Sequence, residues 1–111
     1  MIIGLDIGIS STKVVAFVAK KMNKAEIWES GFSEKQLQEF ISSLSSIDNK
    51  VEKIAITGVG SKNISGKLLG YPTVKVDEFE ANAVSASYIC EESRFIVVSM
   101  GSGTSFVEVD N

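Results

Sequence analysis

The sequence predicts a mixed α/β fold, in which a sheet of parallel and antiparallel strands carries helices on its faces. Three observations indicate this. Three strand-like segments joined by tight turns open the chain, strands and helices alternate after them, and a second glycine turn follows the last long apolar run. The 111 residues are 44% hydrophobic, which is enough for a core of about one domain.

The first three strands are expected to form an antiparallel meander. Ile2–Ile7 is a short apolar run that ends at Gly8, as a buried strand does. Lys13–Ala19 is rich in β-branched residues, and Ala25–Ser30 follows a turn at Asn23. The tight turns between the three segments favour consecutive antiparallel pairing.

A helix with a clear start signal comes next. Ser33 is expected as its N-cap, and Gln36 stands three residues further on, as a capping box requires. The serines after residue 41 and the pair Asp48-Asn49 are expected to end it. One apolar face is formed by Leu37, Phe40, Ile41 and Leu44.

The second half of the chain alternates between strands and helices. Residues 61–69 are expected as a short helix, and Asp77, with Glu80 three residues on, begins a longer one. Further strands are expected at Lys53–Thr57, Thr73–Val76, Phe95–Met100 and Thr104–Val109. The predicted order is therefore β-β-β-α-β-α-β-α, followed by a hairpin.

The segment Ile2–Lys13 corresponds to Phe95–Phe106, since both contain a buried strand, a glycine turn and a second strand. The correspondence predicts a first domain over residues 1–93 and the start of a second, similar domain over 94–111. A stop soon after a strand suggests that the second domain is incomplete. The matched pairs are Gly8 with Gly101, Ser10 with Gly103, and Thr12 with Ser105.

The turn after the first strand contains groups that suit phosphate. Glycine lets a backbone approach a ligand closely, and the amides of a tight turn can cradle an anion. Asp6, at the end of the strand, could hold Mg²⁺ or its waters, because that cation prefers oxygen ligands. An ordinary hairpin with a polar tip explains this segment about equally well. The candidate phosphate-binding residues are Gly8, Ser10, Ser11, Thr12 and Lys13.

A second turn repeats this pattern and makes phosphate binding the better interpretation. It carries small residues with hydroxyl and amide donors directly after a buried strand. Two such turns suggest two hairpins that hold one triphosphate from opposite sides. Its candidate residues are Gly101, Ser102, Gly103, Thr104 and Ser105.

Two other segments have weaker signals. Asp77, Glu78 and Glu80 stand where a strand gives way to a helix, and capping of that helix explains Asp77 and Glu80. Glu78 remains as the candidate for touching a substrate hydroxyl, although spacing alone favours a purely structural role. The turn Thr57–Ser61 could shape a cleft floor, and simple chain reversal is the favoured interpretation.

Composition excludes several classes of function. The net charge is −3 and the basic residues are scattered, which argues against nucleic-acid and membrane surfaces. The chain has no histidine and only Cys90 as a thiol, which excludes Ser-His and Cys-His catalysis within it. The N-terminus lacks a signal-peptide pattern, so a cytoplasmic location is expected.

Four segments together resemble the N-terminal half of the type II, eukaryotic-like pantothenate kinases, which have the actin-like, ribonuclease-H-like ATPase fold. The opening segment is shared by several ATPase families, whereas DEFEA before a small-residue helix and GSGTS after a strand are typical of these kinases. The four segments are GLDIGISSTKVV, AITGVGS, VDEFEANAVSASYI and FIVVSMGSGTSFVEV.

The resemblance implies that ATP phosphorylates the primary hydroxyl of pantothenate, the first step towards coenzyme A, with Mg²⁺ and in a homodimer. It places the general base on Glu78 and the metal near Asp6. It places Gly8 to Lys13 on one side of the phosphates and Gly101 to Ser105 on the other. The family's adenosine-binding segment and a substrate-binding arginine have no counterpart up to Asn111, so the chain alone is expected to be inactive.

Two other functions stay open. The Ile9-Ser10 pair replaces the family's usual glycine and threonine and is closer to the ATPases that activate 2-hydroxyacyl-CoA dehydratases. Those activators tend to have a different second turn and cluster-binding cysteines, whereas this chain has Met100-Gly101-Ser102 and only Cys90. A non-catalytic nucleotide-binding module is the third possibility, and the acid at Glu78 argues against it.

Overall fold

The computed structural model describes residues 1–44 and 50–111, so the expected helix end at Asp48-Asn49 lies outside the described residues. The chain divides into two compact units, Met1–Lys75 and Val76–Asn111. The expected domain boundary between residues 93 and 94 stays a prediction. The elements of the first unit are β1 (Ile2–Ile7), β2 (Thr12–Val18), β3 (Lys21–Trp28), α1 (Glu34–Ser42), β4 (Lys53–Thr57), the 3₁₀ helix η1 (Val59–Asn63), β5 (Lys67–Leu68) and β6 (Tyr71–Lys75). Those of the second are α2 (Glu78–Ile89), β7 (Arg94–Met100) and β8 (Thr104–Asp110).

The first unit contains a six-stranded mixed sheet in the order β3-β2-β1-β4-β6-β5. The meander β1–β2–β3 is antiparallel, whereas β1 pairs in parallel with β4, and β4 in parallel with β6. The predicted mixed α/β sheet is therefore confirmed. The carboxyl ends of β1 and β4 lie side by side, because Asp6 is in register with Thr57.

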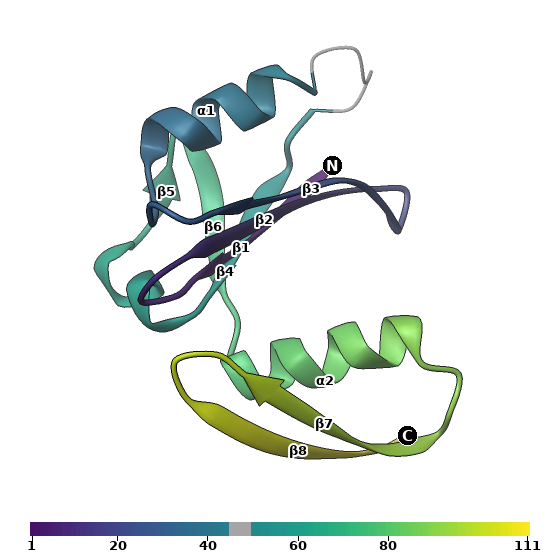
Figure 1. The fold of residues 1–111 in the computed structure, drawn as a ribbon. Coiled ribbons are helices and arrows are strands. Elements are labelled where there is room, and N and C mark those ends of the chain that lie inside the picture. The colour runs from purple at the N-terminus through teal and green to yellow at the C-terminus, as the bar shows by residue number, and fades with distance from the viewer. Residues whose placement is uncertain (45–49) are drawn as a thin grey trace. The chain divides into compact units, whose positions relative to one another are not determined.

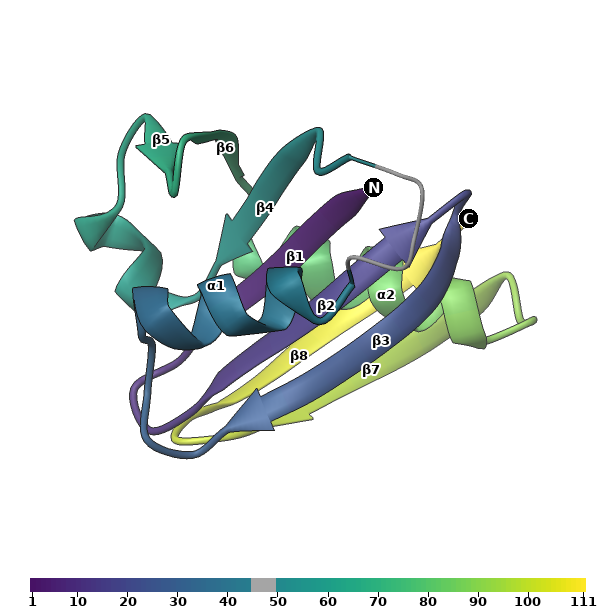
Figure 2. The ribbon, with the colours of Figure 1, turned by 90° about the horizontal axis from the view of Figure 1, so that it is seen from above.

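One face of this sheet and α1 enclose the core. Alternate residues of β1 are buried, as the period of two in a strand requires. Figures 1 and 2 show α1 lying across this face of the sheet. The clustered core residues are Ile3, Leu5, Ile7, Val14, Ala16, Trp28, Leu37, Phe40, Leu44, Ile54, Ile56 and Leu68. The remaining residues of β1, among them Asp6, lie on the opposite face of the sheet.

The start of α1 follows the sequence prediction. The Ser33 side chain accepts a hydrogen bond from the Gln36 amide at 3.3 Å, and the first helical residue is the acidic Glu34. This arrangement satisfies one of the free amides of the first turn, and the negative charge suits the helix dipole.

The short helix expected at 61–69 is the least accurate element of the prediction. The structure has the 3₁₀ helix Val59–Asn63, and the strand Lys67–Leu68 follows it. Gly66 and Gly70 have positive φ angles of 74° and 82°, and such residues break a helix and turn the chain instead.

The second unit consists of α2 and a two-stranded antiparallel sheet. β7 and β8 pair from Arg94 with Asp110 to Met100 with Thr104. Val109 is buried, and the other residues facing the same side are half-buried. The opposite face of the hairpin exposes the apolar side chains of Ile96, Val98, Met100 and Phe106.

Candidate functional site

The turn between β1 and β2 is tight and faces solvent. The Gly8 amide donates a hydrogen bond to the Ser11 carbonyl at 2.9 Å. A Cβ atom on Gly8 would lie 2.9 Å from that carbonyl oxygen, which is too close for an ordinary side chain. Ile9 and Ser10 are exposed at the tip. The turn therefore has little room for a side chain at Gly8, whereas its approach to a ligand stays a prediction.

Asp6 and Lys13 form an ion pair beside this turn. They are in register across β1 and β2, and the Lys13 Nζ lies 3.3 Å from the Asp6 Oδ2. The two side chains are 39% and 56% exposed, so solvent screens the pair. Such a pair contributes about 0–1 kcal/mol and can be opened by a ligand that binds either partner more strongly.

Thr12 differs from the other expected phosphate-binding residues because it is fully buried. It is in register with Ile7, on the core face of the sheet. Its hydroxyl has no hydrogen-bond partner within the part of the chain that the structure describes. Its assignment to phosphate binding stays a prediction.

The turn that follows β4 packs directly against the end of β1. Gly58 has a φ of 88°, and a Cβ atom there would lie 2.4 Å from the Ile7 carbonyl oxygen and 2.7 Å from the Asp6 Oδ1. A Cβ on Gly60 would lie 2.2 Å from the Ile7 Cγ2. The sequence interpretation favoured chain reversal alone for Thr57–Ser61. Gly58 and Gly60 follow β4, a strand that a parallel sheet would place beside the end of β1, and this pattern could have linked the turn to Asp6.

The second unit holds the candidate base. Asp77 caps α2, because its Oδ1 accepts hydrogen bonds from the amides of Phe79 and Glu80 at 2.9 and 3.1 Å. The neighbouring Glu78 is the first helical residue and is exposed. Its carboxylate has no hydrogen bond or ion pair to any described residue. Asp77 therefore serves as the cap, and Glu78 is available for another contact.

The second glycine turn also lies in the second unit. The Gly101 amide donates to the Gly103 carbonyl at 2.8 Å, and Ser102 lies exposed between them. Thr104 and Ser105 begin β8, where Thr104 is exposed and Ser105 is half-buried. The structure therefore groups the expected residues into two sets, with Asp6 to Lys13 in the first unit and Glu78 and Gly101 to Ser105 in the second.

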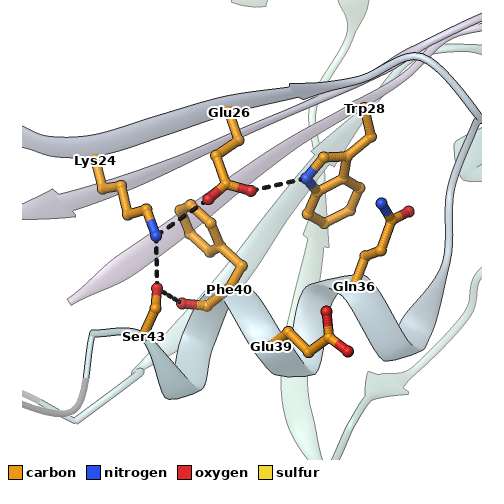
Figure 3. A pocket seen from close by; sticks show the side chains of 7 residues that line it. All are labelled: Lys24, Glu26, Trp28, Gln36, Glu39, Phe40 and Ser43. Atoms are coloured by element: carbon orange, nitrogen blue, oxygen red, sulfur yellow. Dashed lines mark hydrogen bonds and ion pairs between the residues drawn. The ribbon is translucent and has the colours of Figure 1, made fainter.

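A separate small pocket of about 190 Å³ opens between β3 and α1, and none of the expected site residues lines it. Figure 3 shows its seven side chains: Lys24, Glu26, Trp28, Gln36, Glu39, Phe40 and Ser43.

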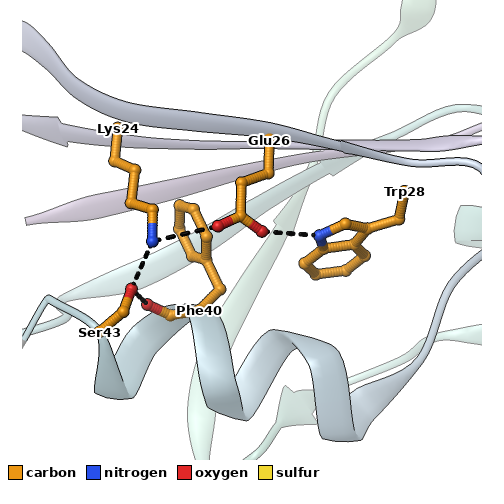
Figure 4. Close-up of polar contacts among 5 residues, drawn as sticks. All are labelled: Lys24, Glu26, Trp28, Phe40 and Ser43. Carbon is orange, nitrogen blue, oxygen red and sulfur yellow. Dashed lines mark hydrogen bonds and ion pairs between the residues drawn. The ribbon is translucent and has the colours of Figure 1, made fainter.

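The polar groups of this pocket bind one another. Glu26 accepts from the Trp28 indole at 3.0 Å and pairs with the Lys24 Nζ at 3.1 Å, as Figure 4 shows. Lys24 also donates to the Ser43 hydroxyl at 2.7 Å and lies 5.1 Å from the centre of the Phe40 ring. The hydrogen bond from Trp28 lowers the pKa of Glu26 below its ordinary value, and the hydrogen bond and charge of Lys24 lower it further. The contacts of Lys24 with Ser43 and Phe40 join the edge strand β3 to α1.

Within residues 1–44 and 50–111, no three acidic, cysteine or histidine side chains gather into a metal site. The assignment of Asp6 to a magnesium site stays a prediction. None of the described helices is both long and apolar enough to cross a membrane.

The sequence is similar to curated type II pantothenate kinases. It is 32% identical to the enzyme of Bacillus anthracis and 34% identical to that of Bacillus cereus, over 98% of this chain. The chain spans about 40% of the length of these relatives. No protein-family model matches the chain. The expected resemblance is confirmed over nearly all of the sequence.

Two solved structures have the same fold. The activator of the 2-hydroxyisocaproyl-CoA dehydratase from Clostridium difficile, with bound ADPNP, matches 98% of this chain and 41% of its own at a TM-score of 0.78 and 22% identity. A putative 2-dehydro-3-deoxygalactonokinase from Sinorhizobium meliloti matches 99% of this chain and 50% of its own, at a TM-score of 0.59 and 10% identity. The chain therefore has the actin-like ATPase fold that the sequence predicted.

Proposed function

We propose that this chain is part of an ATP-dependent pantothenate kinase, in which it contributes the phosphate-binding turns and the general base. The observation that carries the proposal is the similarity to type II pantothenate kinases over 98% of the chain. The uncommitted carboxylate of Glu78 supports it, because a kinase of this kind needs an acid near the substrate hydroxyl.

The proposed reaction makes one bond and breaks one bond. The primary hydroxyl oxygen of pantothenate bonds to the γ-phosphorus of ATP, and the bond from that phosphorus to the β-γ bridging oxygen breaks. Glu78 orients the hydroxyl and accepts its proton, and 4'-phosphopantothenate and ADP leave. Because phosphoryl transfer passes through a loose transition state, the proton moves late and most of the catalysis is positioning.

The chain's own residues supply the phosphate environment in this proposal. Groups of the first turn, among them the exposed Ser10 hydroxyl and the Lys13 ammonium, bind one side of the triphosphate, and groups of the turn Gly101–Ser105 bind the other. Asp6 holds a hydrated Mg²⁺, and its partly exposed carboxylate suits an ion that keeps several waters. The ion supplies neutralisation of phosphate charge. Coenzyme A biosynthesis and a homodimer follow from the same resemblance.

The test is ATP-dependent phosphorylation of pantothenate by the protein in its full length, with Glu78→Gln beside it. Loss of the base is expected to lower kcat by about 10²–10⁴-fold, with a smaller change in KM. Glu80→Gln is the matched control, since Glu80 is an exposed acid of the same helical turn. No turnover of pantothenate, or equal activity of Glu78→Gln and the wild type, would contradict the mechanism.

The second candidate function is an ATPase that drives a conformational change in a partner. The similarity in fold to the dehydratase activator favours it. The two functions differ in whether the rate of ADP formation depends on pantothenate. A kinase forms ADP in proportion to added pantothenate, whereas an activator hydrolyses ATP at a rate that pantothenate does not change.

A further inference from the structure

Two threonine hydroxyls at the end of β1 have no hydrogen-bond partner among the described residues. They belong to Thr12 on β2 and Thr57 on β4, the two strands that flank β1. An unpaired buried hydroxyl destabilises a folded chain, so its presence calls for an explanation. The Thr12 residue is in register with Ile7 on the core face, whereas Thr57 is in register with Asp6 on the opposite face.

Thr57 therefore shares a face with the ion pair of Asp6 and Lys13. Residues in register on neighbouring strands point to the same side of a sheet, and Asp6 lies between Thr57 on β4 and Lys13 on β2. The three side chains form a row across the end of three strands. The row contains a carboxylate, an ammonium and a hydroxyl, the groups that bind a metal ion and phosphate oxygens.

The turn after Thr57 packs closely against the end of β1, next to the row of Thr57, Asp6 and Lys13. A Cβ atom on Gly58 would collide with both the Ile7 carbonyl oxygen and the Asp6 carboxylate, so this position has no room for a side chain. The turn is closed on itself, because the Ser61 hydroxyl donates to the Gly58 carbonyl at 2.6 Å and the Ser61 amide donates to it at 3.1 Å. A turn that serves only to reverse the chain needs no such contact with a charged side chain of another strand.

We infer that the turn Thr57–Ser61 is a third wall of the nucleotide site, in which the Thr57 hydroxyl binds an oxygen of the hydrated metal–triphosphate group beside Asp6. The inference rests on the proposed ATP site of the first unit. It does not depend on pantothenate, because a kinase and an activator ATPase would both bind the nucleotide here. The ligand satisfies the unpaired hydroxyl, and the lack of a side chain at Gly58 leaves room for the Asp6 carboxylate beside the turn.

The experiment measures binding of Mg²⁺·ADPNP, a nucleotide that is not hydrolysed, to the protein in its full length by calorimetry. Thr57→Val keeps the shape of the side chain and removes the hydroxyl, and it is expected to weaken binding by about 10- to 100-fold. Thr57→Ser keeps the hydroxyl and should bind within about threefold of the wild type. Thr73→Val is the control for loss of a threonine hydroxyl elsewhere in the sheet. Thr73 lies on β6 in register with Ile54, and its hydroxyl donates to the Gly66 carbonyl, so this variant should lose stability while its affinity for Mg²⁺·ADPNP stays unchanged.

A second readout separates ligand binding from a structural role. Because Thr57→Val removes an unpaired buried hydroxyl, the thermal midpoint of the nucleotide-free protein should stay unchanged or rise. The rise in midpoint that Mg²⁺·ADPNP causes should shrink in the same variant. A structural threonine would give the reverse, with a lower midpoint without nucleotide and an unchanged rise with it.

Several outcomes would overturn the inference. Unchanged affinity in Thr57→Val would mean that a water or nothing satisfies the hydroxyl, and equal weakening in Thr57→Ser would exclude the hydroxyl as the cause. Failure of the wild type to bind Mg²⁺·ADPNP would overturn both the inference and the proposed function. Nucleotide binding that needs Thr57, without phosphorylation of pantothenate, would overturn the proposed kinase alone.

Discussion

The two glycine turns correspond in sequence but differ in the structure around them. The first runs over residues 8–11, and its flanking residues, Ile7 and Thr12, are buried in a six-stranded sheet. The second runs over residues 101–103 and is flanked by Met100 and Thr104, which are exposed in a two-stranded sheet. The second turn closes one residue earlier than the sequence correspondence predicts, since Thr104 corresponds to Ser11.

This difference shows that two copies of one sequence motif can be packed against very different amounts of surrounding structure. The first turn is held by a buried core on one side and by the Thr57–Ser61 turn at its base. The second rests on a hairpin packed against α2, and its outer face is open to solvent. A hairpin is stable only when a further element covers its apolar face. We therefore expect the first unit to contribute most of the stability of the described chain.

The largest expected effect tests this difference in stability. Phe40 is 2% exposed in the core of the first unit, whereas Phe106 on the second hairpin is 71% exposed. Phe40→Ala should lower the free energy of unfolding by about 3–5 kcal/mol, because it leaves a cavity. Phe106→Ala should change it by less than about 1 kcal/mol. Hydrogen exchange of amides in each sheet measures both, and similar losses in the two variants would contradict the comparison.

The next effect concerns the glycines that support each turn. Gly58→Ala places a Cβ atom against the backbone of Ile7 at a positive φ, so we expect a loss of about 2–4 kcal/mol in the free energy of unfolding. Gly103→Ala is the control, because a Cβ atom there would meet nothing within 4 Å and its φ is not positive. Fluorescence of Trp28, the only tryptophan, reports unfolding of the first unit. Equal stability of Gly58→Ala and the wild type would contradict the close packing.

The sequence predicted those features that depend on neighbouring residues. The apolar run before Gly8, the Ser33 cap and the Asp77 cap each depend on a few adjacent positions, and all three are present. The position of the Thr57–Ser61 turn beside Asp6 was not predicted, because it depends on the parallel pairing of β1 with β4. That pairing joins strands separated by a meander and a helix, and no local pattern specifies its register.

The charged contacts were likewise not predicted where they depend on the pairing or packing of separate elements. The sequence placed Lys13 among the candidate phosphate-binding residues, and the structure pairs it with Asp6, its cross-strand neighbour in the meander. The contacts that join Glu26 to Trp28 and Lys24 were not predicted from the sequence. They lie along one strand at a spacing of two, where residues share a face, and their meeting depends on α1 covering that face.

The smallest expected effect compares the polar contacts at the edges of the two sheets. Above its ordinary pKa of 4.5, the ionised Glu26 is stabilised by Trp28 and Lys24 in the folded chain. Because the pKa is lower in the folded state than in the unfolded state, this stabilisation is present above about pH 4.5 and is lost as the pH falls through the folded value. The side chain is 39% exposed, so solvent screening keeps the effect below about 1 kcal/mol.

Glu26→Gln should therefore flatten the decline in stability of the first unit as the pH falls below about 4.5, measured by urea unfolding with Trp28 fluorescence. The matched variant is Glu108→Gln, which breaks the ion pair from Arg94 to Glu108 in the second unit. That pair is 71% and 62% exposed, so its loss should leave the unfolding of the first unit unchanged at every pH. A pH dependence that survives in Glu26→Gln would show that other carboxylates carry it, and would contradict the stabilisation ascribed to Glu26.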